Sequence, residues 1–366
     1  MLECKECLMN SSVIEFKLFP DGICNFCREF NAKKHLYSGF SKIQEKNNLK
    51  NLVTKIKNKN KKYDCLIGLS GGTDSSYLVY LAWKLKLNPL LIHMDNGWNS
   101  KISNLNISKI LEKTGFDYET LILDWEEFKH LQISFLKAGV PDIEILTDHA
   151  ISAYILNHAL KNKIKYIFSG INFATEHSPI PSWGWRKDDY NHIHKIHKKF
   201  GKKKITTFPK TYPLKRLFYE KFLKKIKYIY PLNLINYNST KAKKKLKEVF
   251  DWKDYGGKHF ESFFTKFFQG YILPKKFKID KRILHLSCRI RNNEITRDEA
   301  KDIISMPYLE TQQILEYESF FKKKLNLSDV ELREIMNAEP KKHSDYDYDI
   351  YSNIVLQKIK KILLHD

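Results

Sequence analysis

The sequence has no apolar run as long as the roughly 18–20 residues that a membrane-spanning helix requires. Its first residues carry no signal-peptide pattern. Arginine is scarce, because only 8 of the 64 basic residues are arginine and the other 56 are lysine. Because it shows neither a membrane-spanning run nor a signal-peptide pattern, we expect a cytoplasmic protein that does not insert into a membrane.

The formal net charge of +22 raises the question of nucleic-acid binding. Proteins that recognise phosphates or bases favour the two-pronged guanidinium of arginine, which is the scarce basic residue here. Lysine-rich runs such as 55–62, 198–204 and 241–247 are typical of solvated faces. We therefore do not expect a nucleic-acid partner, whereas a positive field would favour an acidic small substrate.

Four of the six cysteines form two Cys-x-x-Cys pairs, Cys4 with Cys7 and Cys24 with Cys27. The segment 20–22 between them, Pro-Asp-Gly, is typical of a hairpin turn. Together the pairs supply the four thiolates of a structural zinc site, which leaves no open position for catalysis. An iron–sulfur cluster and a pair of disulfides are the alternatives, and a cytoplasmic location argues against disulfides.

The segment 70–76, Ser-Gly-Gly-Thr-Asp-Ser-Ser, lies between a strand predicted over 64–69 and a helix predicted over 74–87. Two glycines let the backbone approach a phosphate closely, and the free N–H groups at a helix start point toward it. The hydroxyl groups add donors, and Asp74 can lie near a magnesium ion. Neither the Walker loop nor the dinucleotide fingerprint fits, because the required lysine and third glycine are missing. The alternative interpretation is a tight turn that binds nothing.

Apolar strands predicted over 64–69, 90–94, 118–123 and 166–169 alternate with helical patterns. This alternation predicts an α/β fold, a doubly wound parallel sheet with helices on both faces. In such a sheet, ligands bind at the carboxyl ends of the strands.

The order of these patterns along the chain predicts four regions. Residues 1–30 are expected to form a zinc ribbon and 31–62 a helical linker. A nucleotide-binding domain is predicted over 63–213. A helical C-terminal region over 214–366, with a last helix at 350–364, is expected to contribute to the substrate site.

Polar residues follow the predicted strands at their carboxyl ends, among them Asp95, Gly170 and Asn172. Thr147 and Asp148 stand at the start of a predicted helix and could simply cap it. Several polar strand ends that converge on one crevice favour a binding site over isolated structural roles.

The segment 177–213 is predicted to be rich in loops, and it contains His177, His192, His194 and His197. A second metal site there is conceivable. Because His194 and His197 lie in a lysine-rich surface pattern, we favour a mobile active-site loop instead.

Five further stretches carry a resemblance to a known family. They are 147–150 (Thr-Asp-His-Ala), 170–176 (Gly-Ile-Asn-Phe-Ala-Thr-Glu), 254–262 (Asp-Tyr-Gly-Gly-Lys-His-Phe-Glu-Ser), 266–269 (Lys-Phe-Phe-Gln) and 280–287 (Asp-Lys-Arg-Ile-Leu-His-Leu-Ser). With the cysteine pairs and the glycine loop, the chain resembles the N-acetyl sugar amidotransferases of bacterial surface-glycan pathways. These belong to the PP-loop ATP pyrophosphatase superfamily. The resemblance covers about residues 1–305.

The resemblance implies an ATP-dependent ligase that converts the acetamido group of a sugar to an acetamidino group. Related enzymes are similar to those that amidate pseudaminic or legionaminic acid derivatives for flagellin glycosylation, or acetamido sugars of the lipopolysaccharide O-antigen. The reaction would use ATP and Mg2+ beside a structural Zn2+, and pass through an adenylylated imidate. The sequence shows no glutaminase nucleophile, so we infer a separate glutaminase subunit that supplies ammonia, as the family also implies.

The resemblance also implies roles for individual residues of this chain. The ATP-binding residues would be Ser70, Gly71, Gly72, Thr73, Asp74, Ser75, Ser76, Asp95 and Gly170. The catalytic residues would be Asp74, Asp148, Lys258, His259 and Arg282. The substrate-binding residues would be Asn172, Thr175, Glu176, Trp185 and Lys281. For Lys281 and Arg282, a salt-bridged helix start fits equally well.

The main alternative is a tRNA-modifying PP-loop enzyme that performs thiolation or lysidine-type ligation. Its thiolation members use catalytic cysteines beside the loop, whereas here only Cys65, inside a strand, and the lone Cys288 remain. The segment 256–258, Gly-Gly-Lys, fits the sugar family better. An RNA-binding protein without activity would leave Asp74 unexplained.

Overall fold

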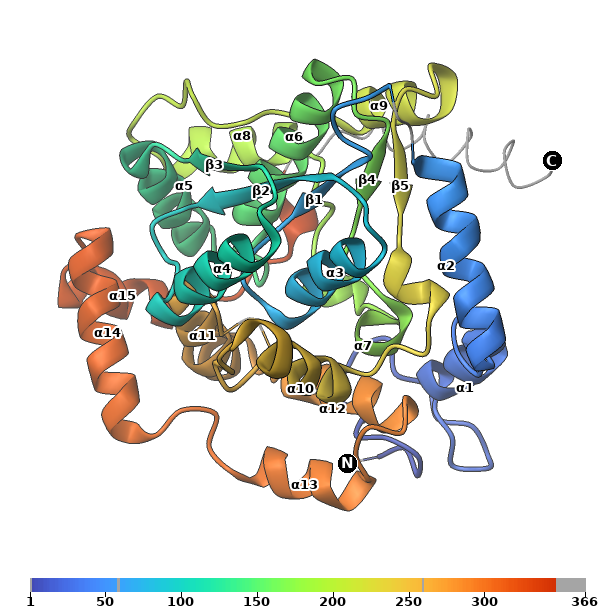
Figure 1. Ribbon diagram of the computed structural model, residues 1–366. Coiled ribbons are helices and arrows are strands. Elements are labelled where there is room, and N and C mark those ends of the chain that lie inside the picture. The colour runs from blue at the N-terminus through green and yellow to red at the C-terminus, as the bar shows by residue number, and fades with distance from the viewer. Residues whose placement is uncertain (1, 58–59, 259, 347–366) are drawn as a thin grey trace.

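A computed structural model describes residues 2–57, 60–258 and 260–346. Within them, five parallel strands form a sheet of order β3-β2-β1-β4-β5 (Figure 1). The strands are β1 (Cys65–Gly68), β2 (Pro89–Asp95), β3 (Tyr118–Ile122), β4 (Tyr166–Phe168) and β5 (Lys227–Ile229). The chain leaves β1 on one side toward β2 and β3 and returns on the other side through β4. The carboxyl end of β1 therefore lies at the point where the strand order reverses, which is where open α/β sheets bind ligands.

The four strands predicted from the sequence are confirmed, and β5 was missed. β5 extends the sheet by pairing Lys227 with Tyr166 and Ile229 with Phe168. It is only three residues long and lies in a lysine-rich region, so it shows no usable hydrophobic period. The prediction of helices alone from residue 214 onward is therefore wrong at this strand.

Helices cover both faces of the sheet, as predicted for this fold class. One face is covered by α2 (Lys42–Ile56), α3 (Thr73–Lys84), α4 (Lys101–Thr114) and α10 (Ser239–Phe250), and the other by α6 (Ile145–Lys161). Alternate side chains of β1 enter the two cores, because Cys65 and Ile67 pack with the first group and Leu66 with α6. The strand reads as a continuous apolar run because both of its faces are buried.

The helix boundaries follow local capping chemistry. The Ser100 side chain accepts a hydrogen bond from the Ser103 N–H at the start of α4, and Gly115 ends that helix with a left-handed φ of +64°. α6 begins at Ile145 with Glu144 in the capping position. Thr147 and Asp148 therefore lie inside the first turn of α6, and they do not cap it.

The remaining α-helices lie in the ribbon, around the sheet and in the C-terminal region. They are α1 (Asn25–Lys33), α5 (Trp125–Ala138), α7 (Phe173–Glu176), α8 (Tyr190–Phe200), α9 (Pro213–Leu217), α11 (Phe263–Phe267), α12 (Arg282–Arg291), α13 (Arg297–Ser305), α14 (Thr311–Leu325) and α15 (Asp329–Asn337). α8 lies inside the segment 177–213, so the prediction of loops there is wrong over these eleven residues. The helix predicted over 350–364 lies outside the described residues. In the described part of the chain, no helix is both long enough and apolar enough to cross a membrane.

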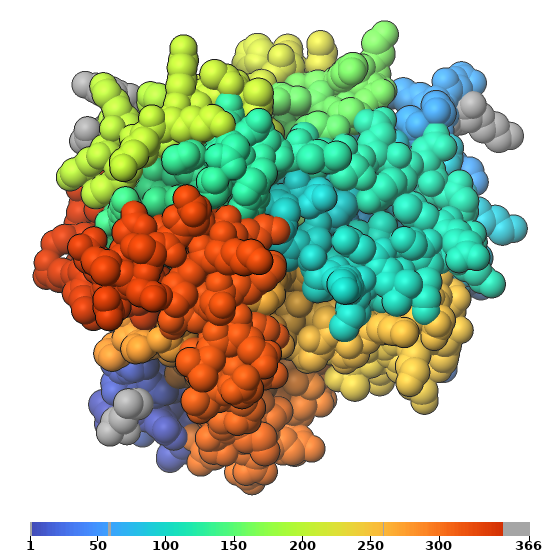
Figure 2. Space-filling view, turned by 90° about the vertical axis from the view of Figure 1, so that its left-hand side faces the viewer, coloured from blue at the N-terminus to red at the C-terminus, as the bar shows by residue number. Residues whose placement is uncertain are grey.

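The C-terminal helices pack directly on the rest of the molecule. Figure 2 shows the orange and red helices of this region beside the teal segment that follows β2, with the blue N-terminal ribbon next to them. Phe321 of α14 and Ile335 of α15 share a core with Phe135 of α5. Leu8 of the ribbon packs with Leu286 of α12. Ribbon, sheet and C-terminal helices thus form one packed body.

Candidate active site

The loop after β1 has the local geometry predicted for an anion-binding turn. Gly71 has a φ of +78°, and a Cβ atom there would lie 2.6 Å from the carbonyl oxygen of Ser103, so only glycine fits. α3 begins at Thr73, which places the first N–H groups of the helix at the loop. The Thr73 N–H donates to the Tyr255 hydroxyl over 2.9 Å.

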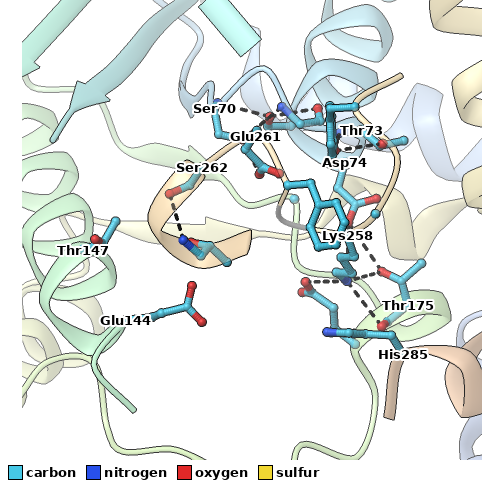
Figure 3. Close-up of a pocket in the computed structure, with 18 of the residues that line it drawn as sticks. Ser70, Thr73, Asp74, Glu144, Thr147, Thr175, Lys258, Glu261, Ser262 and His285 are labelled. Carbon is cyan, nitrogen blue, oxygen red and sulfur yellow. Dashed lines mark hydrogen bonds and ion pairs between the residues drawn. The ribbon is translucent and has the colours of Figure 1, made fainter. Parts of the chain in front are cut away.

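A cavity of about 770 Å³ opens over this loop (Figure 3). This volume is in the range of enzyme ligand sites, about 300–1,000 Å³. The walls come from the glycine loop, the end of β2, α6, the segment around 255–262, α12 and the turn near 303–308. Its polar lining includes Ser70, Thr73, Asp74, Glu144, Thr147, Thr175, Lys258, Glu261, Ser262 and His285.

Asp74, Lys258 and Glu176 form a charged cluster at the loop end of the cavity. The Lys258 Nζ lies 2.9 Å from Glu176 Oε1 and 3.8 Å from Asp74 Oδ2. It also donates to the Thr175 hydroxyl over 3.2 Å. Burial acts to lower the pKa of Lys258, yet the charges of Glu176 and Asp74 raise it above its usual value, so the ammonium stays charged.

Asp74 is held from a second side by Tyr237, whose hydroxyl donates to Asp74 Oδ1 over 2.5 Å. Burial raises the pKa of Asp74, whereas the Lys258 charge acts to lower it. Tyr237 was not predicted as a site residue, because 163 residues separate it from Asp74 and only the fold brings them together.

Glu261 is a further site residue that was not predicted. Its Oε1 lies 3.4 Å from the Ser70 hydroxyl, and a Cβ atom on Gly72 would meet that same oxygen at 2.7 Å. The backbone around Glu261 is fixed, because the Ser100 N–H donates to its carbonyl oxygen over 2.8 Å. Burial, together with the Asp74 charge, raises the pKa of Glu261 to about 7. A carboxyl group therefore lies against a loop built for anions, where it favours its protonated form or a neighbouring cation.

Replacing Glu261 by glutamine is expected to stabilise the ligand-free protein more at pH 8 than at pH 5. The folded-state pKa is raised to about 7 from an ordinary value of 4.5. The stability that the carboxyl contributes is therefore fully present below about pH 4.5 and is lost as the pH rises through about 7. An amide does not titrate, so the Tm difference between Glu261→Gln and wild type should grow with pH in thermal melts. Glu112→Gln, an exposed change on α4, is the control. A Tm difference that is equal at both pH values would contradict the buried position of Glu261.

The structure brings most of the predicted site residues to this cavity. Those that line it are Ser70, Gly72, Thr73, Asp74, Ser75, Asp148, Gly170, Thr175, Glu176, Lys258 and Arg282. Gly71, in the loop, and the buried Ser76, in the first turn of α3, do not line it. His259 lies outside the described residues.

Four predicted site residues make structural contacts within the chain and do not line the cavity. Asp95 accepts from the Gly97 N–H over 2.8 Å and shapes a turn, and Asn172 caps α7 by accepting from the Thr175 N–H over 2.9 Å. The Trp185 ring packs on His343 with a centroid distance of 5.4 Å. Lys281 Nζ lies 3.2 Å from Glu144 Oε2, so it reaches the cavity only through its partner.

The Arg282 charge is already paired within the chain. Its guanidinium donates to Asp280 Oδ2 over 2.7 Å and to the Met306 carbonyl oxygen over 2.7 Å. The salt-bridged helix start, one of the two sequence interpretations, is therefore present at the start of α12. Asp148 is paired as well, with Lys187 Nζ 3.3 Å away.

Comparison with known proteins gives one family match, in the C-terminal part of the chain. Residues 261–360 match the family model described as "LPS biosynthesis protein WbpG-like, C-terminal domain". The match covers the C-terminal part of the chain only. No curated protein sequence matches the chain.

Three solved structures illustrate the more distant likenesses. The NMN synthetase from Francisella tularensis is 14% identical, with a TM-score of 0.37, covering 79% of this chain and 98% of that chain. A predicted subunit of tRNA methyltransferase from Methanocaldococcus jannaschii is 18% identical, with a TM-score of 0.30, covering 50% and 76%. The NH3-dependent NAD synthetase from Campylobacter jejuni is 16% identical, with a TM-score of 0.30, covering 57% and 93%. The TM-scores are low, so these likenesses carry no argument about function.

The WbpG-like segment supplies one wall of the cavity. Its lining residues are Glu261, Ser262, Thr265, Arg282, His285, Leu286, Arg289, Ile303, Met306, Pro307 and Tyr308. The glycine loop after β1 supplies another part of the lining, next to Glu261. The two parts of the chain, far apart in sequence, therefore enclose the same space.

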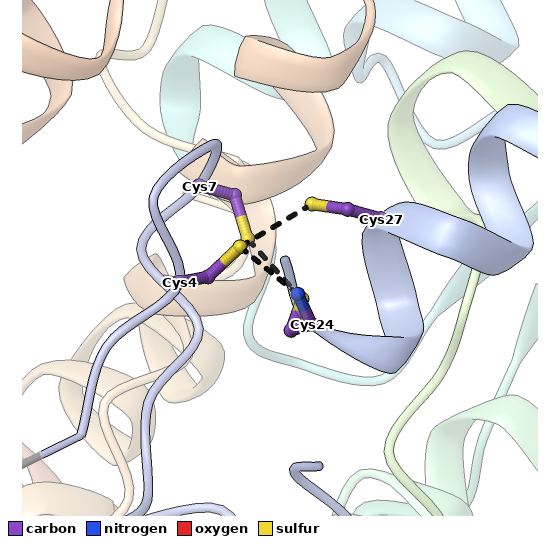
Figure 4. A group of neighbouring side chains, drawn as sticks. All are labelled: Cys4, Cys7, Cys24 and Cys27. Atoms are coloured by element: carbon purple, nitrogen blue, oxygen red, sulfur yellow. Dashed lines mark hydrogen bonds between the residues drawn. The ribbon is translucent and has the colours of Figure 1, made fainter. Parts of the chain in front are cut away.

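The four cysteines of the N-terminal ribbon form a compact cluster (Figure 4). All four Sγ atoms lie within 4.8 Å of one another, with 3.8 Å between Cys4 and Cys27 and 3.7 Å between Cys7 and Cys24. Four thiolates about 2.3 Å from one zinc ion at tetrahedral angles would lie about 3.8 Å apart, so the cluster fits the predicted ion. The Cys24 N–H donates to Cys4 Sγ over 3.3 Å, as suits a thiolate.

Replacing Cys4 by serine is expected to lower the zinc content to well below one ion per chain and the Tm by about 5 °C or more. The reason is that a weaker fourth ligand releases the ion that closes the ribbon. Metal analysis and thermal melts measure both effects. Cys288→Ala, a change at a buried cysteine outside the cluster, should leave the zinc content unchanged. Unchanged zinc in Cys4→Ser would contradict the assignment.

The four cysteines are the only group of three or more possible metal ligands in the described residues. The histidines of 177–213 therefore form no second group of this kind among the described residues. The expectation of a surface pattern is wrong for His197, which is buried, with its Nδ1 2.9 Å from the Ser134 hydroxyl. His192 is buried too, and its Nε2 lies 2.9 Å from His343 Nδ1.

Proposed function

We propose that the protein is an ATP-dependent enzyme of bacterial surface-glycan synthesis that converts the acetamido group of a sugar to an acetamidino group. One observation carries this proposal. The Ser-Gly-Gly loop, suited to phosphates, and the WbpG-like segment, from a lipopolysaccharide biosynthesis family, line the same cavity. A loop suited to phosphates and a segment similar to a lipopolysaccharide biosynthesis family lie in the same cavity. This combination favours the activation of a sugar by a nucleotide.

The proposed chemistry begins with activation, because an amide carbon is a poor electrophile and ammonia cannot displace its oxygen directly. The amide oxygen attacks the α-phosphorus of ATP, an O–P bond forms, and pyrophosphate leaves. Ammonia then adds to the carbon of this O-adenylyl imidate and loses a proton. The C–O bond breaks, AMP departs with the former amide oxygen, and the amidine remains.

The chain's own residues have distinct tasks in this scheme. The loop N–H and hydroxyl groups would hold the phosphates that leave as pyrophosphate. Lys258, fixed between Asp74 and Glu176, would offset negative charge at the phosphates. Asp74, oriented by Tyr237, would hold Mg2+, which supplies charge neutralisation to the leaving pyrophosphate when bound. Glu261 faces the same loop and would either carry a proton or approach that cation.

Substrate and ammonia source are parts of the same proposal. The sugar would be a nonulosonic acid such as pseudaminic acid or a nucleotide sugar of the O-antigen, both of which are anionic. A separate glutaminase subunit would deliver ammonia. A thiolation reaction on tRNA is less well supported, since burial raises the pKa of Cys288 to about 11 and Cys65 lies in the core.

The experiment incubates the protein with ATP, Mg2+, ammonium and a panel of acetamido sugars, and records product masses. We expect a sugar whose mass changes by the exchange of an oxygen atom for an NH group, with AMP and pyrophosphate formed in equal amounts. ATP cleavage that is absent with every sugar and present with tRNA would overturn the proposal in favour of tRNA modification.

A further inference from the structure

α12 connects the cavity to the cysteine cluster. His285 and Arg289 on this helix line the cavity, and its last residue, Arg291, reaches the sulfur atoms. The Arg291 Nε donates to Cys27 Sγ and its Nη2 donates to Cys7 Sγ, each over 3.3 Å. A zinc ion held by four thiolates keeps a net negative charge, which a buried guanidinium can offset.

The third contact of Arg291 leads toward the glycine loop. Its Nη1 lies 2.9 Å from His177 Nε2. The other ring nitrogen, Nδ1, lies 2.9 Å from the Phe173 carbonyl oxygen, so the hydrogen-bond network places the imidazole proton on Nδ1 and leaves Nε2 to accept from Arg291. Burial lowers the pKa of His177 to about 4, in agreement with a neutral ring.

His177 directly follows α7, the helix whose last two residues contact the Lys258 side chain. Thr175 and Glu176 at the end of α7 contact the Lys258 ammonium, which in turn pairs with Asp74. From the ribbon side, Phe30 of α1 stacks on Phe173 of α7 with a centroid distance of 5.0 Å. A continuous set of contacts thus runs from the thiolates through Arg291 and α7 to the lysine at the loop.

We infer that Arg291 is a positioning residue that couples the cysteine metal centre to the cavity, fixing α7 and α12 through its bonds to two sulfurs and to His177. The ribbon would then organise the site as well as stabilise the chain. This inference goes beyond the proposed reaction, and it holds whichever ligand the cavity binds.

Arg297 provides a matched control at the same cluster. Its Nε donates to the Cys7 carbonyl oxygen over 3.2 Å and its Nη2 to the Cys4 carbonyl oxygen over 3.0 Å. Arg297 thus supports the backbone of the same cysteines, and the hydrogen bonds of its guanidinium go to oxygen atoms, including Glu3 Oε2. Loss of Arg297 should weaken the ribbon without changing the sulfur environment or the link to α7.

The first test uses the protein loaded with Co2+ in place of zinc. Removing two N–H donors makes the thiolates more electron-rich, so Arg291→Met should shift the sulfur-to-cobalt charge-transfer band to lower energy. Arg297→Met should leave the band in place, and Arg291→Lys, which keeps a charged donor, should give an intermediate shift. An unchanged band in Arg291→Met would overturn the contact on which the inference rests.

The second test measures hydrogen–deuterium exchange of zinc-loaded protein in peptides that cover 173–177 and 282–291. In Arg291→Met we expect exchange about tenfold faster in both peptides, while Arg297→Met matches wild type. Removing zinc from the wild-type protein should accelerate hydrogen–deuterium exchange in the same peptides. A shifted cobalt band with unchanged exchange would overturn the coupling. If Arg291→Met does not fold, the comparison of stripped and loaded wild type decides alone, and unchanged exchange at 173–177 overturns the inference.

Discussion

Replacing Lys258 by methionine is expected to lower the rate of ATP-dependent AMP formation by about 10³-fold, with little change in the far-UV circular dichroism spectrum. Mutations that remove one preorganised charge or donor from a developing anion cost about 10²–10³ in rate. Lys258 also pairs with Asp74 and Glu176, so its loss leaves two neighbouring carboxylates facing the phosphates without a cation. The measurement is the initial rate of AMP and pyrophosphate release with saturating sugar and ammonium.

Lys243→Met is the matched control for this prediction. Lys243 lines the same cavity, and its Nζ pairs with the half-exposed Asp254 over 2.9 Å. An exposed ion pair contributes little, so the rate should stay within about threefold of wild type. Equal losses of rate in the two variants would mean that the rate depends only on the net charge of the cavity. A Lys258→Met protein with the wild-type rate would remove Lys258 from the proposed mechanism.

Replacing Asp74 by asparagine is expected to abolish pyrophosphate release while the fold is retained. The amide has the same shape and can still accept from the Tyr237 hydroxyl, but it is a poor ligand for a hard cation. Calorimetric titration with ATP should show binding that no longer strengthens when Mg2+ is added. Retained pyrophosphate release would contradict the proposed role of Asp74 as a magnesium ligand.

Tyr237→Phe separates orientation from charge at the same carboxylate. It removes the hydroxyl that donates to Asp74 and leaves the carboxylate in place, so we expect the rate of ATP cleavage to fall about tenfold.

In wild type, burial raises the pKa of Asp74, and the carboxylate is the form that binds a cation. The rate of ATP cleavage should therefore fall toward acid at a higher pH than for an exposed aspartate.

The parts of the site that sequence reasoning found are those encoded by adjacent residues. The glycine loop was predicted because strand, turn and helix follow one another over about twenty residues, each with its own local signal. The cysteine centre was predicted from ligand spacing alone. In both cases the local pattern determines which atoms meet.

Glu261 and Tyr237 were missed because they meet the loop only through the tertiary fold. The bridge between Asn99 and Ser262, which positions Glu261, joins segments more than 160 residues apart. The stretch 254–262 carried the resemblance and contains Glu261, but only the fold shows that its carboxyl group meets Ser70. Lys281 and Arg282 illustrate an ambiguity of the sequence. A ligand contact and a salt-bridged helix start fitted their charges equally well, and the structure pairs them with Glu144 and Asp280 inside the chain.

The measurement that tests the account most directly follows the amide oxygen of the sugar. An acetamido sugar accepted by the enzyme would be prepared with a heavy oxygen isotope in the acetyl carbonyl group, then incubated with ATP, Mg2+ and ammonium. Attack of that oxygen on the α-phosphorus predicts that the label appears in AMP, one atom for each amidine formed. Label in pyrophosphate or inorganic phosphate, or label that stays in the sugar while ATP is cleaved, would contradict the adenylylation that the loop and the WbpG-like wall are proposed to perform.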